Sequence, residues 1–244
     1  MRTTLGFIGS GLIGSTLARL ATAAGVDVVM SNSRGPETLG GLVAELGDRA
    51  RAATTRDAAR DADLVVVTVP LTAYPDLPVA ALAGKTVIDT TNYYPQRDGR
   101  IAELDADALT SSELLQRRLS SSDVVKAVNN VFFHQLGMLA RPSAAPDRSA
   151  LPIAGDDDAA KHDVVRLLDT LGYDAVDTGT LATSWRSEPT TPVYVMPYAG
   201  TLPEGLGAAE LQQWMATTGG VPVSAAQVKD LVAAAVRGPA GGSF

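Results

Sequence analysis

Three glycines near the start of the chain are spaced for binding a phosphate group. Gly9, Gly11 and Gly14 form the pattern Gly-x-Gly-x-x-Gly directly after the apolar run 5–8. Where this pattern joins a strand to a helix, the first glycine permits a tight turn, the second lets a pyrophosphate approach the backbone, and the third lets the helix pack closely. The helix N-terminus then favours an anion. We therefore predict a dinucleotide site, the alternative being a glycine-rich turn without a ligand.

The residues after the second predicted strand distinguish NADP from NAD. An acidic side chain about 20 residues after the glycines would hydrogen-bond the 2′-hydroxyl of NAD. This chain has Ser31, Asn32, Ser33 and Arg34 there, and Asp27 stands too early, at the start of the strand. A guanidinium beside two hydroxyls suits the 2′-phosphate of NADP. We predict NADP(H), the alternative being that Arg34 is only a solvated turn residue.

The elements that must position these residues alternate along the chain. Short apolar runs at 5–8, 26–30, 64–69, 86–88 and 124–125 are typical of strands covered on both faces. Segments 12–24, 37–46 and 111–119 carry leucine, alanine and charge at helical spacing. Strand and helix in repeated alternation predict an α/β fold with a doubly wound parallel sheet. A strand at 151–154, a helix at 157–171 and a strand near 173–176 extend the sheet by one more βαβ step.

The second part of the chain is more irregular. Residues 141–152 are rich in proline, serine and alanine and predict a boundary. The expected organisation is a dinucleotide-binding domain over 1–141, a C-terminal α/β extension over 149–237 that shapes the acceptor site, and a flexible tail over 238–244. Segment 184–204 holds four prolines, and we interpret it as an ordered functional loop. Helices are predicted at 208–216 and 224–236.

Composition excludes several classes of function. The 244 residues include no cysteine and two histidines, which excludes disulfides, iron–sulfur clusters and multi-histidine metal sites. The net charge of −7 argues against nucleic acid or an anionic membrane as a partner. No apolar stretch approaches the roughly 18 residues of a membrane span, and no signal-peptide core is evident. We expect a soluble, cytoplasmic protein without a metal.

Residues without an ionisable side chain gather where the predicted strands end. Pro70, Thr91, Asn92, Asn129 and Asn130 follow strands at the edge where ligands bind in open α/β sheets. These side chains can orient a ring but do not titrate. Hydride transfer between stacked rings needs orientation more than proton transfer, so this set suits such a reaction.

Four titratable residues near this edge have two interpretations each. Lys126 and Asn130 resemble the Lys-x-x-x-Asn pair of β-hydroxyacid dehydrogenases, in which the lysine gives a proton, but Lys126 also suits a structural role. His134 either hydrogen-bonds a coenzyme or substrate, or lies at a helix start. Tyr93 and Tyr94 either stack on an aromatic coenzyme or simply pack.

The glycine turn, segment 31–34, Val67-Thr-Val-Pro70 and Asp123-Val-Val-Lys-Ala-Val-Asn-Asn130 together resemble the NADPH:coenzyme F-420 oxidoreductase family. The likeness runs over about the first 180 residues. The chain is similar also to the cytosolic domain of the six-transmembrane metalloreductases, which pass a hydride from NADPH to a flavin. The resemblance implies a Rossmann fold, a homodimer, and hydride transfer between NADP(H) and a deazaflavin, coenzyme F-420.

The resemblance also implies roles for single residues. It assigns the pyrophosphate to Ser10, Leu12 and Ile13 with the glycines, the 2′-phosphate to Ser31, Ser33 and Arg34, and the path to the nicotinamide to Val69, Pro70 and Leu71. One segment departs from it: this chain has Asn129-Asn-Val-Phe-Phe133 where the deazaflavin enzymes have a His-Thr-Ile-Pro-like run.

Three functions therefore stay open. The first is hydride transfer between NADP(H) and a small-molecule redox acceptor, either coenzyme F-420 or a flavin. The second is a carbonyl, imine or β-hydroxyacid reductase that uses Lys126. The third is an NADP(H)-binding sensor without catalysis.

Overall fold

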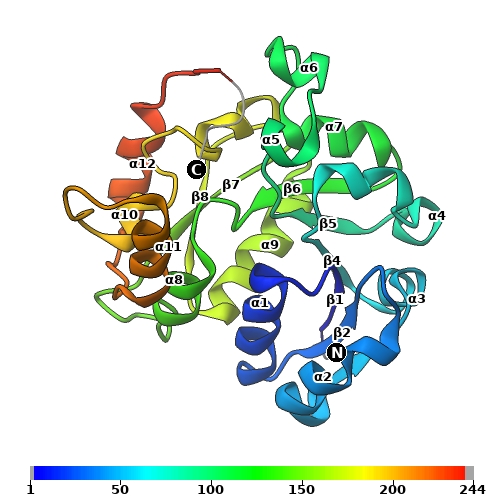
Figure 1. Cartoon of the computed structure of the whole chain (residues 1–244). Coiled ribbons are helices and arrows are strands. Elements are labelled where there is room, and N and C mark those ends of the chain that lie inside the picture. The colour runs from blue at the N-terminus through cyan, green and yellow to red at the C-terminus, as the bar shows by residue number, and fades with distance from the viewer. Residues whose placement is uncertain (1–2, 240–244) are drawn as a thin grey trace.

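An eight-stranded sheet with helices on both faces forms the centre of the computed structural model, which describes residues 3–239 (Figure 1). The order of the strands is β3-β2-β1-β4-β5-β6-β7-β8. The strands are β1 (Thr4–Ile8), β2 (Asp27–Ser31), β3 (Ala50–Ala52), β4 (Leu64–Val67), β5 (Thr86–Asp89), β6 (Asp123–Ala127), β7 (Ala150–Gly155) and β8 (Asp174–Asp177).

The order reverses at β1, which pairs in parallel with β2 on one side and with β4 on the other. The carboxyl end of β1 is therefore a switch point, where two neighbouring connections leave in opposite directions and open a crevice. The glycine turn lies at this point. The predicted α/β fold with a doubly wound sheet is confirmed.

One strand pairing differs from the expectation of a wholly parallel sheet. Strand β7 runs antiparallel to β6, with Ala127 opposite Ile153 and Val125 opposite Gly155. In this register β7 starts beyond the carboxyl end of β6, so the chain returns to the sheet from the edge at which it left. No complete crossover separates the two strands. The added βαβ step itself is parallel, because β7 pairs in parallel with β8.

The helices cover the sheet in two groups, because alternate strand residues point to opposite faces. Val66 lies in one core cluster, and its neighbours Val65 and Val67 lie in the other. The first cluster packs against α1 (Leu12–Ala23), η1 (Pro36–Leu39), α2 (Gly40–Leu46), α8 (Phe133–Met138), α9 (Asp158–Leu171) and α12 (Ala225–Ala233). The second packs against α3 (Thr55–Asp61), η3 (Leu71–Asp76), α4 (Val79–Leu82), α6 (Ala102–Asp105), α7 (Ser111–Arg118) and η4 (Leu181–Ser187), where η denotes a 3-10 helix.

The remaining helices are short or lie at the periphery. They are η2 (Gly47–Arg49), α5 (Pro95–Asp98), α10 (Met196–Ala199) and α11 (Ala208–Thr217). Segment 184–204, predicted to be an ordered loop, thus contains the end of η4 and all of α10. Residues 240–244 of the predicted tail lie outside the described residues. Between residues 3 and 239 no helix is long and apolar enough to cross a membrane.

Candidate functional site

Two of the three motif glycines are required by the fold itself. Gly9 has a φ of +114°, and a Cβ there would lie 2.3 Å from the carbonyl oxygen of Thr68. A Cβ on Gly14 would lie 2.7 Å from the carbonyl oxygen of Gly9. Both glycines therefore let the turn pass close to β4 and let α1 begin against it.

Gly11 is different, because nothing among residues 3–239 explains why it lacks a side chain. Its φ of −72° is open to any residue, and a Cβ there would meet no atom of these residues within 4 Å. Gly11 is the N-cap of α1, yet no side chain caps this helix and its first turn holds no acidic residue. The open space therefore faces the unpaired N–H groups of a helix N-terminus, which fits a pyrophosphate.

Segment 31–34 divides into a buried and an exposed part. Ser31 is fully buried, and its hydroxyl donates to a backbone carbonyl of β1 at 2.5 Å. The Asn32 side-chain oxygen accepts from the Arg34 backbone N–H at 2.9 Å, and its amide donates to Thr38 at 2.9 Å. Ser33 and Arg34 are exposed. Within residues 3–239 the Arg34 guanidinium makes no hydrogen bond or ion pair, so it is available to a phosphate, whereas Ser31 is not.

The segment that follows β4 carries apolar side chains. Val69 is half-buried and Pro70 is exposed, whereas Leu71 is buried at the start of η3. Further along η3, the Tyr74 hydroxyl lies 2.6 Å from the Thr91 hydroxyl, which connects this segment to the end of β5. Leu12, at the start of α1, is 61% exposed, although leucine usually packs.

Two asparagines join the carboxyl ends of β5 and β6. The side-chain amide of Asn129 donates to the Asn92 side-chain oxygen at 3.1 Å, and that of Asn92 donates to the Asn129 backbone carbonyl at 2.8 Å. The Asn129 amide also donates to the Ser187 carbonyl of η4 at 2.8 Å. Both asparagines are nine-tenths buried. They brace the edge rather than present free amides to a ligand.

Asn130 is close to two residues with a strained backbone, Val128, which precedes it by two positions, and Val195, which donates to its carbonyl. Its amide donates to the carbonyl of Val193 and to the Tyr198 hydroxyl, and its backbone carbonyl accepts from Val195. Val128 and Val195 have φ values of +58° and +56°, which are unfavourable for β-branched residues. Such strain persists where the surroundings over-determine the backbone, as at ligand sites.

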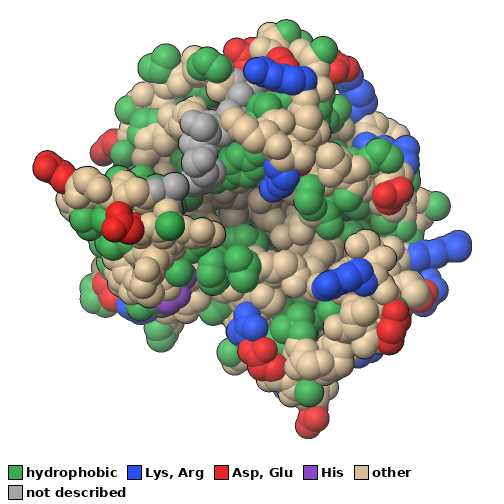
Figure 2. Space-filling view, viewed as in Figure 1, with side chains coloured by type: hydrophobic (Ala, Val, Ile, Leu, Met, Phe, Trp, Pro, Cys, Tyr) green, Lys and Arg blue, Asp and Glu red, His purple; other side chains and the backbone are tan. Residues whose placement is uncertain are grey.

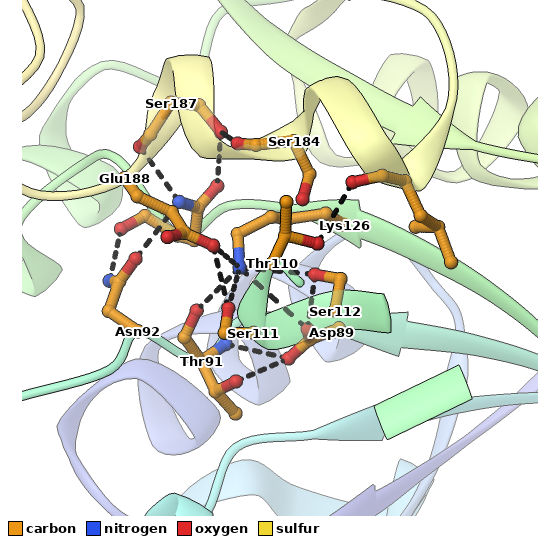
Figure 3. Close-up of polar contacts among 12 residues, drawn as sticks. Asp89, Thr91, Asn92, Thr110, Ser111, Ser112, Lys126, Ser184, Ser187 and Glu188 are labelled. Carbon is orange, nitrogen blue, oxygen red and sulfur yellow. Dashed lines mark hydrogen bonds and ion pairs between the residues drawn. The ribbon is translucent and has the colours of Figure 1, made fainter. Parts of the chain in front are cut away.

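Lys126 lies at the centre of a buried polar cluster (Figure 3). Its ammonium group donates to the Thr91 carbonyl at 3.0 Å and to the hydroxyls of Ser111 and Ser112 at 2.7 and 3.1 Å. Glu188, which directly follows η4, lies 3.1 Å from the ammonium group, and Asp89, the last residue of β5, lies 3.8 Å from it. The ammonium group has no solvent exposure, and its partners join β6 to β5, to α7 and to the residue that follows η4. This geometry favours the structural interpretation of Lys126.

The other titratable candidates lie in different surroundings. His134 is half-buried in α8, and its ring meets that of Phe133 edge-on at 6.5 Å between centroids. Tyr93 is buried, and its hydroxyl bonds to the Gly99 carbonyl and to Asp105, which agrees with packing. Tyr94 is half-buried, and its hydroxyl bonds to that of Tyr194.

Sequence reasoning missed three residues of this edge: Ser187, Glu188 and Tyr194. All three belong to segment 184–204, which was interpreted as an ordered functional loop because it holds four prolines. Figure 2 shows this face hollowed near its centre, with hydrophobic side chains around the hollow and Lys or Arg side chains at its rim. In the same view of Figure 1, the start of α1 lies just below this region.

A doubly wound sheet with a glycine turn at its switch point is typical of dinucleotide-binding proteins. Residues 4–93 match the family described as "NADP oxidoreductase coenzyme F420-dependent". This match supports the resemblance seen in the sequence and the prediction of an NADP-dependent oxidoreductase.

The chain is similar to several known proteins over most of its length. It is 29% identical over 195 residues to Metalloreductase STEAP3 of Rattus norvegicus, which covers 79% of this chain and 37% of that protein. Hypothetical protein SMa0349 of Sinorhizobium meliloti is 29% identical, with a TM-score of 0.70 over 80% of this chain and 94% of that one. A putative F420-dependent NADP-reductase of Arthrobacter sp. FB24 is 25% identical, with a TM-score of 0.62 over 75% and 87%. The chain spans about two fifths of the length of the curated relatives it matches.

Proposed function

We propose that the protein transfers a hydride between NADP(H) and a flat ring acceptor, either a deazaflavin such as coenzyme F-420 or a flavin. The observation that carries this proposal is the open space at Gly11. There the chain omits a side chain that its own fold has room for, directly before the free N–H groups of α1. An exposed guanidinium at Arg34 stands on the neighbouring connection and suits the 2′-phosphate.

NADPH, when bound, supplies the hydride and its electron pair. The chain's own contribution is binding and orientation. Gly9–Gly14 and α1 hold the pyrophosphate, with Ser10, Leu12 and Ile13 lining it. Ser33 and Arg34 hold the 2′-phosphate, and Val69–Leu71 form the wall along the path to the nicotinamide. The braced edge, with Thr91, Asn92, Asn129 and Asn130, keeps the strand ends fixed beneath the two rings, as orientation-controlled transfer requires.

The name of the Arthrobacter protein, and the flavin route of metalloreductase-like domains, support a ring as the acceptor. The Lys126-dependent reductase is the weaker alternative, because all three hydrogen-bonding directions of this ammonium group end on protein oxygens. A homodimer and a cytoplasmic location belong to the same proposal, on the strength of the resemblance.

An acceptor panel tests the proposal. The protein is mixed with NADPH and with coenzyme F-420, FMN, FAD, or a set of ketones and imines, and loss of the reduced-nicotinamide absorbance is followed. We expect oxidation with a ring acceptor and none with the carbonyl set. Tight NADPH binding without oxidation by any acceptor would instead establish the sensor, and turnover with ketones alone would establish the small-substrate reductase.

A further inference from the structure

Two tyrosines from distant parts of the chain meet near the carboxyl edge of the sheet, where the proposed acceptor would bind. Tyr94 follows Asn92 by two residues and is the N-cap of α5. Tyr194 directly precedes Val195, whose N–H donates to the Asn130 carbonyl at 2.8 Å. The two hydroxyls form a hydrogen bond although the residues stand 100 positions apart. Both side chains are only partly buried.

The surroundings of the two phenols differ. Burial raises the pKa of Tyr94, so it stays protonated at neutral pH, whereas hydrogen bonds from Tyr194 and the Asn92 amide lower it. The Arg97 guanidinium, 4.9 Å above the ring centroid, also lowers this pKa, and the charge of Asp98 raises it.

The pKa of Tyr194 is also raised, first by burial and then by Tyr94 itself. Arg97 lowers this pKa, and the charge of Glu188 raises it. Either hydroxyl can donate in the hydrogen bond that joins the pair. Because the Arg97 guanidinium lies over the Tyr94 ring, where it favours a phenolate, we assign the donor role to Tyr194.

We propose that Tyr94 gives a proton to the acceptor ring as the hydride arrives, with Tyr194 as its hydrogen-bond donor. This inference rests on the proposed hydride transfer. The O–H bond of Tyr94 breaks and an N–H bond forms on a ring nitrogen of the acceptor. The acceptor is reduced by the hydride, NADPH is oxidised to NADP⁺, and water restores the phenol through the Tyr194 hydroxyl, so that one solvent proton is consumed per turnover.

Other titratable groups near this edge are less suited. Lys126 is enclosed by its oxygen partners. Asp89 accepts hydrogen bonds from Thr91 and Ser112 and is fully buried. The Tyr93 hydroxyl is used by Asp105 and the Gly99 carbonyl.

The test compares Tyr94→Phe and Tyr194→Phe with Tyr93→Phe as the control for loss of a neighbouring hydroxyl. Thermal melting checks that each variant folds, and fluorescence titration measures NADPH binding. With a ring acceptor, we expect Tyr94→Phe to lower kcat by about 100-fold, the usual range of a general acid. NADPH affinity should stay within about twofold, and the solvent deuterium isotope effect on kcat should disappear. Tyr194→Phe should lower kcat by about tenfold, and Tyr93→Phe should have no effect on kcat when corrected for folded protein.

A second readout needs no turnover. Fluorotyrosine is placed at position 94 and titrated by ¹⁹F NMR in the protein without acceptor. Replacing Tyr194 by phenylalanine should raise the pKa at position 94, because the phenolate loses a donor. If the wild-type protein is active and Tyr94→Phe keeps the same kcat and isotope effect, this inference alone is overturned. An unchanged pKa in the NMR titration would also overturn it. If the wild-type protein fails to oxidise NADPH with each of the ring acceptors, both the proposed function and this step are overturned.

Discussion

At the residue scale, the three motif glycines separate what folding needs from what a ligand needs. Gly9 and Gly14 are forced by contacts within 3 Å of the backbone, whereas Gly11 faces open space. Ser31 and Arg34 differ in the same way. The Ser31 hydroxyl is buried and hydrogen-bonded inside the sheet, whereas Arg34 is exposed without a partner among the described residues. The two residues that the fold leaves free are those that a dinucleotide would contact.

Substituting Gly11 should separate binding from stability. Gly11→Ala places a methyl group where the pyrophosphate approaches, so NADPH affinity should fall at least about tenfold. The folded state should lose at most about 1 kcal/mol, because only a helix N-cap is weakened. Gly9→Ala is the matched control: its positive φ and close contact with Thr68 should cost about 1–3 kcal/mol or more. Fluorescence titration and chemical denaturation measure the two effects, and equal destabilisation by both variants would contradict the assignment.

Replacing the exposed arginine should change cofactor preference. Arg34→Ala removes a charge-assisted contact to the 2′-phosphate, so NADPH should bind ~10–100-fold more weakly. NADH lacks that phosphate and should be barely affected. Equal losses for both dinucleotides would show that Arg34 acts on the fold of the turn instead. Arg56, an exposed arginine of α3, offers a control by the same substitution.

At the element scale, much of the architecture follows from the sequence, because buried strands and amphipathic helices have distinct patterns. Strand β3 was missed since it has three residues, with Arg51 in the middle. Helix α8 was expected only as a helix start at His134, because Phe132 precedes it where a polar cap would mark the first turn. The antiparallel pairing of β7 was not predictable, since a fully buried strand has the same composition in either direction. The Tyr94–Tyr194 contact depends on how distant strands pair, so no local sequence pattern predicts it.

The cluster around Lys126 should matter for stability at this scale. Lys126→Met leaves Asp89 and Glu188 without their buried counter-charge, which should cost about 3–5 kcal/mol. Turnover of the remaining folded protein with a ring acceptor should stay within about fivefold, since the ammonium group gives no proton to substrate. Denaturation and kinetic assays check this, with the exposed Lys229→Met as control. Abolished turnover in a variant of normal stability would instead favour the Lys126-dependent reductase.

At the scale of the whole molecule, a core cluster packs on each face of a single continuous sheet. The cofactor-binding candidates all lie along one edge of that sheet. Six tyrosines pack around and behind that edge, and burial raises the pKa of each: Tyr74, Tyr93, Tyr94, Tyr173, Tyr194 and Tyr198. The folded state is therefore most stable while these phenols are neutral.

This predicts a stability limit at high pH. Each folded-state tyrosine pKa lies above the unfolded value of about 10, so the contribution is fully present below that pH. Above it the unfolded chain releases protons first, and stability falls as pH rises. The thermal midpoint should show no tyrosine-linked loss below roughly pH 9 and should fall steeply above about 10. Melting curves followed across this range measure it, and a midpoint that holds well above pH 10 would contradict the burial of the phenols.

The most direct test of the account is calorimetric titration of the wild-type protein with NADPH and, separately, with NADH. Binding of one dinucleotide per chain, with NADPH at least about tenfold tighter, is the result that the open space at Gly11 and the exposed Arg34 predict. Absence of heat with either dinucleotide, or equal affinity for both, would contradict it.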